Sequence, residues 1–260
     1  MAWLMKYVQI CWIGCCAVAM LGATRLLTRE AVPVGWLDVF VFSATVFGYY
    51  FNTPARNRQW FVWSLGLPAF FSYFQLDFTV KLAALLPALI LASYYGWQRP
   101  GNAGLRRLLL VKPHAIAFAW SWVTVVLPLV PAHWDQAAFL FAGRAGFIFA
   151  LALAYDLHDR AFDLEHGLAT LANQQNLVQT MRMFDGALAV AAVFAGLDYY
   201  IAGVSFAATC ARWVSLAASA VLVRYFLKNA RLEPWRKMLI DGLMVLQWAL
   251  IALATYFALD

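Results

Sequence analysis

Apolar runs close to twenty residues long recur along this chain and decide its fold class. A helix needs about 20 apolar residues to cross the hydrocarbon core of a bilayer, and only 12% of the 260 residues are charged. The mean hydropathy is +0.70. The sequence predicts an all-α membrane protein with a single polytopic domain over residues 1–260. It has nine candidate spans, near 8–27, 34–52, 60–75, 78–97, 111–131, 136–155, 184–201, 203–225 and 238–258.

The basic residues predict the orientation of these spans. Cytoplasmic segments of membrane proteins carry an excess of Lys and Arg, and nine spans with a cytoplasmic N-terminus put fourteen basic residues inside and three outside. The fourteen are Lys6, Arg56, Arg58, Arg99, Arg106, Arg107, Lys112, Arg160, Arg182, Arg224, Lys228, Arg231, Arg236 and Lys237. We therefore expect a bacterial inner-membrane protein whose N-terminus faces the cytoplasm. The net charge of +6 is spread over short loops, which suits anionic lipid headgroups and argues against nucleic acid.

An acidic segment follows the sixth span, where Asp156–Glu165 holds four of the thirteen carboxylates. Asp156, Asp159 and Asp163 are spaced i, i+3 and i+7, so on a helix they share one face. Carboxylates repeated at this spacing suit Mg²⁺, which binds one or two of them and completes its shell with water and substrate phosphates. A solvated loop with ordinary charges fits the same spacing, and both interpretations stay open at this point.

The acidic segment resembles the second aspartate motif of the UbiA superfamily of intramembrane prenyltransferases, which reads Asp-x-x-x-Asp-x-x-x-Gly-x-x-Thr-Leu. The residues that match in register are Asp159, Asp163, Gly167, Thr170 and Leu171, and Asp156 matches an Asp or Asn often found three residues upstream. The resemblance implies a helical bundle around a central lipid-accessible cavity that is capped on the cytoplasmic side. It also implies a prenyl diphosphate donor, a lipophilic aromatic or quinone-like acceptor, and Mg²⁺ held by Asp156, Asp159 and Asp163.

The first aspartate motif of that family is not retained. At the inner end of the second span Asn52 fits the pattern, but Thr53, Arg56 and Trp60 stand where three acids are expected. Arg56 and Arg58 can form paired hydrogen bonds to phosphate oxygens, so we consider them diphosphate ligands that replace a metal. They also fit a simple role as positive-inside residues.

Further basic residues are candidates for substrate binding. Lys112 opens the fifth span at the inner face, where the resemblance places cations near the diphosphate, and Arg160 lies inside the acidic segment. Arg144 lies in the sixth span, about 18 Å from Asp156 at 1.5 Å per residue. A buried arginine in a membrane needs a cavity or a partner, and Asp38 is one possible partner.

Three other polar features carry structural expectations. Arg212 and Asp198 lie on neighbouring spans and are expected to pair, whereas Asp185 and Asp241 are expected to cap helix N-termini. The polar stretch 173–182 is expected to form a short helix over the cytoplasmic mouth.

Several functions fit this sequence. The first is prenyl transfer from a prenyl diphosphate to a lipophilic acceptor. The alternatives are a non-catalytic isoprenoid-binding or assembly protein with the same fold, favoured by the altered first motif, and a terpene cyclase of the same type. A transporter fits less well, because the acids cluster at one membrane boundary and not at mid-depth.

Overall fold

A computed structural model describes residues 2–29, 34–51, 59–95, 98–99, 102–103, 111–130, 134–165 and 170–257. Within these residues nearly all of the backbone is helical, as expected where lipid offers no partner for backbone polar groups. The long helices are α1 (Ala2–Thr28), α2 (Trp36–Phe51), α3 (Gln59–Gln75), α4 (Phe78–Tyr95), α5 (Val111–Ser121), α7 (Trp134–His158), α10 (Leu177–Ile201), α11 (Phe206–Lys228) and α12 (Arg236–Phe257). The short elements are β1 (Gln98–Arg99), β2 (Asn102–Ala103), η2 (Trp122–Val126), α6 (Leu127–Leu129), α8 (Arg160–Glu165), α9 (Leu171–Gln174) and η3 (Ala230–Trp235).

Five helical stretches are long and apolar enough to cross a membrane. They are Tyr7–Thr28, Ala137–His158, Leu177–Ile201, Phe206–Lys228 and Ala230–Phe257, and a shorter apolar helix covers Phe78–Leu91. Large apolar side chains such as Trp63, Phe70 and Phe78 are exposed on the outside of the bundle, where they suit contact with lipid tails. The chain is an integral membrane protein.

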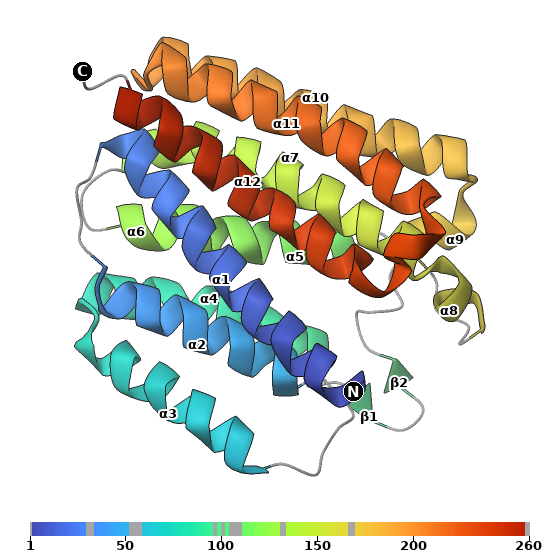
Figure 1. The fold of residues 1–260 in the computed structure, drawn as a ribbon. Coiled ribbons are helices and arrows are strands. Elements are labelled where there is room, and N and C mark those ends of the chain that lie inside the picture. The colour runs from blue at the N-terminus through green and yellow to red at the C-terminus, as the bar shows by residue number, and fades with distance from the viewer. Residues whose placement is uncertain are drawn as a thin grey trace.

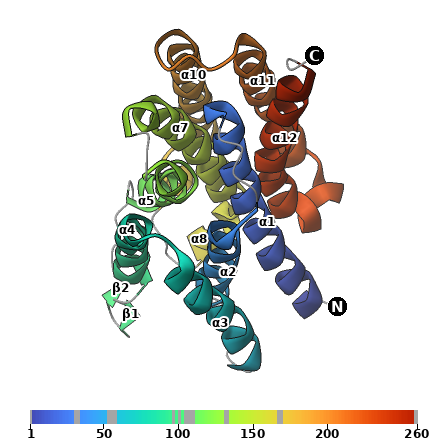
Figure 2. The ribbon, with the colours of Figure 1, turned by 90° about the vertical axis from the view of Figure 1, so that its left-hand side faces the viewer.

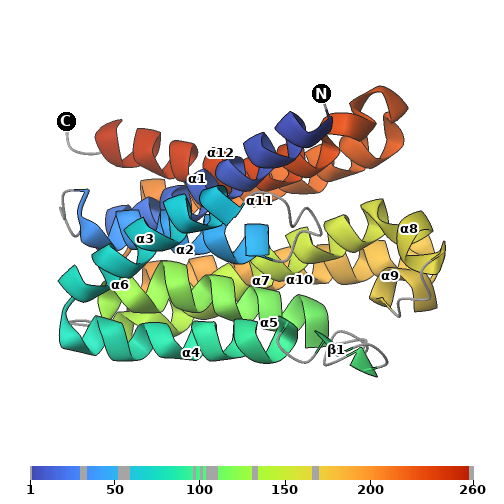
Figure 3. The same cartoon turned by 90° about the horizontal axis from the view of Figure 1, so that it is seen from below.

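The helices lie side by side, with the connecting segments gathered at the two ends of the bundle (Figure 1). Figure 2 shows α1 near the middle, α10 and α11 at one edge and α3 at the opposite edge. Seen from below, α1 begins toward the end that carries α8, α9 and β1, whereas α12 ends at the other end (Figure 3). We refer to the end with α8 and α9 as the α8 end.

The helices α7 and α10 are in close contact along much of their length. A Cβ atom added to Gly146 would lie 2.9 Å from the Ala187 carbonyl oxygen and 3.2 Å from the Ala191 nitrogen. Small residues at membrane helix interfaces let backbones approach in this way. Phe147 and Phe184 are fully buried in the same core. The middle of α7 is therefore fixed against α10 by dense packing.

The predicted fifth span is a helix with a wider turn in its middle. Its N-terminal half is α5, its C-terminal end is α6, and the π-helix η2 joins the two. Thr124 in η2 is fully buried, and its hydroxyl donates to the Trp120 carbonyl at 2.8 Å. No sequence pattern predicted this element, which is rare and often found at functional sites.

The polar stretch after the acidic segment differs from the prediction. The expected short helix over 173–182 is wrong, because α9 ends at Gln174 and α10 already begins at Leu177. Asn176 starts α10 with a capping box, in which its side chain accepts from the Gln179 nitrogen at 2.8 Å and the Gln179 side chain accepts from the Asn176 nitrogen at 3.2 Å. Such caps satisfy backbone donors that otherwise lack a partner. The helix thus extends seven residues beyond the predicted span start.

Candidate functional site

The acidic segment lies where α7 ends and α8 begins, and helical hydrogen bonds run through it. The Asp159 nitrogen donates to the Tyr155 carbonyl and the Asp163 nitrogen donates to the Asp159 carbonyl, both at 2.9 Å. Asp156 and Asp163 are buried, with 1% and 3% of their surface exposed, while Asp159 is half-buried. The turn therefore directs carboxylates inward at the α8 end.

Asp156 forms a buried ion pair with Lys112. The Lys112 ammonium at the start of α5 donates to Asp156 Oδ1, and the Asp156 side chain is 2% exposed against 22% for Lys112. Asp156 Oδ2 is buried without a hydrogen-bond partner among the described residues. The structure thus brings together two of the predicted site residues from different helices.

Asp159 forms a second ion pair, with Lys237 at the start of α12. Lys237 Nζ lies 2.9 Å from Asp159 Oδ1, and both side chains are about one-third exposed, at 35% and 30%. His158 Nε2 lies 3.8 Å from the same oxygen, and Arg236 holds His158 Nδ1 at 3.0 Å. The sequence pattern predicts Lys237 only as one of the positive-inside residues. Its place at the N-terminal end of the last span was the only available signal.

These contacts bear on the expected Mg²⁺ site. Asp156 and Asp159 each have a lysine as an ionic partner, and the described residues contain no group of three or more His, Cys, Asp or Glu side chains placed to hold a metal ion. The donor set at this end is therefore two lysine–aspartate pairs together with Asp163. It does not fit a magnesium site built from three carboxylates.

The rest of the motif is only partly described. Thr170 and Leu171 are buried, and Thr170 stands directly before α9. Gly167 lies outside the described residues, as do Asn52, Arg56 and Arg58, so their predicted roles stay predictions. Arg160 opens α8 and is half-buried, and it makes no ion pair within the part of the chain that the structure describes.

Arg144 lies elsewhere in the bundle and is held by neutral oxygen atoms. One of its nitrogens donates to the Met20 carbonyl at 2.9 Å and to the Thr124 hydroxyl at 3.3 Å, and another donates to the Thr24 hydroxyl at 3.3 Å. It does not pair with Asp38, because Arg25 takes that carboxylate at 2.7 Å. Arg144 thus connects α7 with α1 and η2, far along α7 from Asp156.

Of the other predictions for ionic side chains, one is confirmed and one is wrong. Arg212 pairs with Asp198, as predicted, and both are buried. The prediction that Asp185 caps a helix is wrong, because α10 begins at 177 and Asp185 binds Arg224 through both carboxylate oxygens at 2.6 Å.

The prediction that Asp241 caps a helix N-terminus is also wrong. It lies five residues into α12 and is buried, at 2% exposed. On the same helix interface the Tyr155 hydroxyl donates to the Lys237 carbonyl at 3.0 Å, and Cys16 Sγ donates to the Asp241 carbonyl at 3.4 Å. These polar groups hold α1, α7 and α12 together beside the acidic segment.

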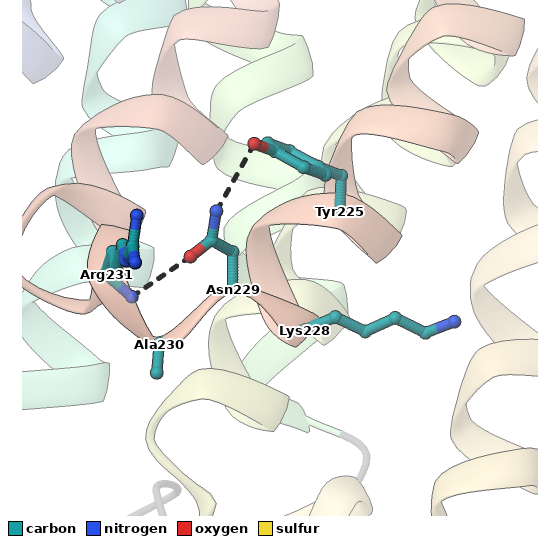
Figure 4. A pocket seen from close by; sticks show the side chains of 5 residues that line it. All are labelled: Tyr225, Lys228, Asn229, Ala230 and Arg231. Carbon is teal, nitrogen blue, oxygen red and sulfur yellow. Dashed lines mark hydrogen bonds between the residues drawn. The ribbon is translucent and has the colours of Figure 1, made fainter.

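A shallow hollow of about 460 Å³ lies where α11 meets η3 (Figure 4). Its lining residues are Tyr225, Lys228, Asn229, Ala230 and Arg231. Asn229 orders the loop, since its side chain donates to the Tyr225 hydroxyl at 3.2 Å and accepts from the Arg231 nitrogen at 3.1 Å. The Lys228 side chain extends away from Arg231 in Figure 4. The two cations do not converge on one point, so we regard this hollow as a secondary feature.

Comparison with known proteins identifies the fold. A UbiA homolog from Aeropyrum pernix K1, in its apo form, has a TM-score of 0.65 at 15% sequence identity, over 96% of this chain and 98% of that chain. A structure of digeranylgeranylglyceryl phosphate synthase in membranes has a TM-score of 0.59 at 14% identity, over 99% and 98% of the two chains. The chain has the UbiA fold.

The UbiA fold confirms the fold class that the acidic motif predicted. The likeness spans almost the whole chain in both comparisons, although no protein-family model and no curated protein matches the sequence. The similarity found in these comparisons therefore lies in the helix arrangement. This UbiA fold presents its acidic segment together with Lys112 and Lys237.

Proposed function

We propose that this protein is a membrane prenyltransferase that moves a prenyl group from a prenyl diphosphate to a lipophilic, aromatic or quinone-like acceptor. The observation that supports this proposal best is the segment that resembles the second aspartate motif, in a chain with the UbiA fold. The segment lies at the end of α7, and its Asp156 and Asp159 form ion pairs with lysines from α5 and α12. We place the diphosphate at the α8 end. We place this end at the cytoplasmic face of a bacterial inner membrane, in line with the positive-inside pattern.

Prenyl transfer requires that the negative charge on the departing diphosphate is stabilised. Breaking the bond between the allylic carbon and the diphosphate oxygen leaves its electron pair on the diphosphate. The acceptor then bonds to the allylic carbon and loses a proton. Preorganised cations near the leaving oxygens lower the barrier to such a step. Lys112 and Lys237 supply two such cations, and their paired aspartates hold them in place.

A direct assay tests this function. The purified protein in liposomes is incubated with prenyl diphosphates of several lengths and with aromatic and quinone-like acceptors, and pyrophosphate release and prenylated products are measured. We expect product from the native protein and a large loss in Asp163→Asn. The matched control is Asp185→Asn at the same end, which removes only an exposed ion pair. If no prenyl diphosphate is consumed and Asp163→Asn behaves like the native protein, the proposal is wrong.

A second candidate function is non-catalytic isoprenoid binding. It is favoured by Thr53, Arg56 and Trp60 in place of the first-motif acids. Native mass spectrometry of the detergent-extracted protein separates the two functions. A bound isoprenoid that is never converted supports the binder, whereas released pyrophosphate supports the enzyme.

A further inference from the structure

We propose that the α8 end binds phosphate groups through Lys112 and Lys237 and needs no divalent metal ion for this binding. The inference rests on the proposed function and deepens it, because it names the groups that hold the diphosphate. In this arrangement Asp156 and Asp159 are positioning residues for the lysines.

The ion pairs leave hydrogen-bonding capacity on both lysines. An ammonium group has three N–H donors. Lys112 donates to Asp156 Oδ1, and Lys237 lies 2.9 Å from Asp159 Oδ1, and neither has a second carboxylate partner among the described residues. A phosphate can therefore accept from the remaining donors while both ion pairs persist. The buried Asp156 carboxylate does not lose its partner, which would be costly.

The two lysines bind aspartates that lie about one turn apart at the end of α7. Asp156 and Asp159 are three residues apart, so their lysines reach α7 within about one helical turn of each other. Lys112 comes from α5 and Lys237 from α12, and both side chains remain partly exposed, at 22% and 35%. Both ammonium groups thus keep part of their surface accessible at the α8 end, and the pyrophosphate experiment below tests whether one anion contacts both.

The charges of the described residues at the α8 end point to the same conclusion. Asp156 and Asp159 each have a lysine partner. A region in which the aspartates already have lysine partners favours an anion over a second cation.

The test measures binding of inorganic pyrophosphate to the full-length protein in detergent by isothermal titration calorimetry, with EDTA and with Mg²⁺. We expect binding in EDTA, with an affinity within about threefold of that in Mg²⁺. Lys237→Met should weaken binding about 10- to 100-fold, as expected for a lost charge-assisted contact, and Lys237→Arg should restore most of it. Lys228→Met is the matched control, since it removes the same charge from the same end outside this pair.

Each other outcome of these measurements overturns one part of the proposal. Binding that requires Mg²⁺ and disappears in Asp159→Asn overturns the metal-free site but leaves the proposed function standing. Binding in EDTA that is unchanged in Lys237→Met and in the double variant Lys112→Met, Asp156→Leu overturns the assignment to these lysines. Turnover of a prenyl diphosphate without measurable pyrophosphate binding in EDTA also contradicts the inference. Absence of both binding and turnover removes the proposed function itself. Lys237 is the preferred probe because its pair is partly exposed, so its loss threatens folding less than loss of Lys112.

Discussion

The Lys112 ammonium donates to the Asp156 carboxylate and so joins the first turn of α5 to the last turns of α7. Removing one partner of a buried ion pair leaves an uncompensated charge, which costs about 3–5 kcal/mol. We therefore expect Lys112→Met to lower the free energy of unfolding by about that amount. Thermal unfolding in detergent measures the change. The double variant Lys112→Met, Asp156→Leu should recover most of the loss, and a single variant as stable as the native protein would contradict the buried pairing.

A different stability effect is expected at Arg144, because its partners are neutral. Thr24 accepts from Arg144, and its hydroxyl also donates to the Thr124 carbonyl at 2.7 Å. Thr24→Val keeps the shape and removes both contacts, so we expect a loss of about 1–3 kcal/mol. The matched control is Thr255→Val, since Thr255 bonds only to carbonyls of its own helix. The same melting experiment compares the two, and equal stability would argue against the Arg144 network.

Helix packing gives a third prediction. A methyl group at Gly146 meets the backbone of α10, whereas one at Gly186 has nothing within 4 Å. Gly146→Ala should therefore destabilise the protein by about 1–3 kcal/mol through overpacking. Gly186→Ala should be neutral or slightly stabilising, because alanine is the better helix former. The melting temperatures of the two variants test this directly, and the reverse order would mean that α7 and α10 are not in close contact.

The start of α10 supplies a fourth prediction. Asn176→Ala removes the side chain that accepts from the Gln179 nitrogen. Loss of an N-cap costs about 0.5–2 kcal/mol. We expect the first turn of α10 to exchange its amide hydrogens faster, while the middle of the helix keeps its protection. Hydrogen exchange with mass spectrometry measures both regions, and Asn176→Ser should retain most of the native protection.

The sequence was sufficient for the membrane class, because that depends on local composition. Spacing alone left the acidic segment open between a metal site and a solvated loop, and the resemblance to a family motif singled out Asp159 and Asp163. Their functional role stays a prediction. The lysine partners of Asp156 and Asp159 could not be predicted, because Lys112 and Lys237 lie far from these acids in the chain and meet them only through helix packing.

Helix ends were the weakest part of the prediction, because hydropathy detects only the apolar part of a helix. The first turns of α10 are polar, so its start at Leu177 lay outside the predicted span. The misplaced boundary then led to the wrong role for Asp185. No residue pattern in 122–126 distinguishes the π-helix η2 from an ordinary α-helix. Its place in the core is seen in the contacts of Thr124.

The wider turn at η2 has a consequence for how this chain tolerates insertions and deletions. A π-helical turn closes its hydrogen bonds over five residues where an α-helix uses four, so it holds one residue more than a regular helix would. Deleting one residue within 122–126 would give a continuous α-helix from 111 to 129 with ordinary geometry. The side chains on either side of the deletion would keep their present faces, because the wider turn already accommodates the extra residue. The change would be confined to this turn, where the Thr124 carbonyl accepts from the Thr24 hydroxyl at 2.7 Å, so the chain can lose one residue here without turning α5 relative to α6.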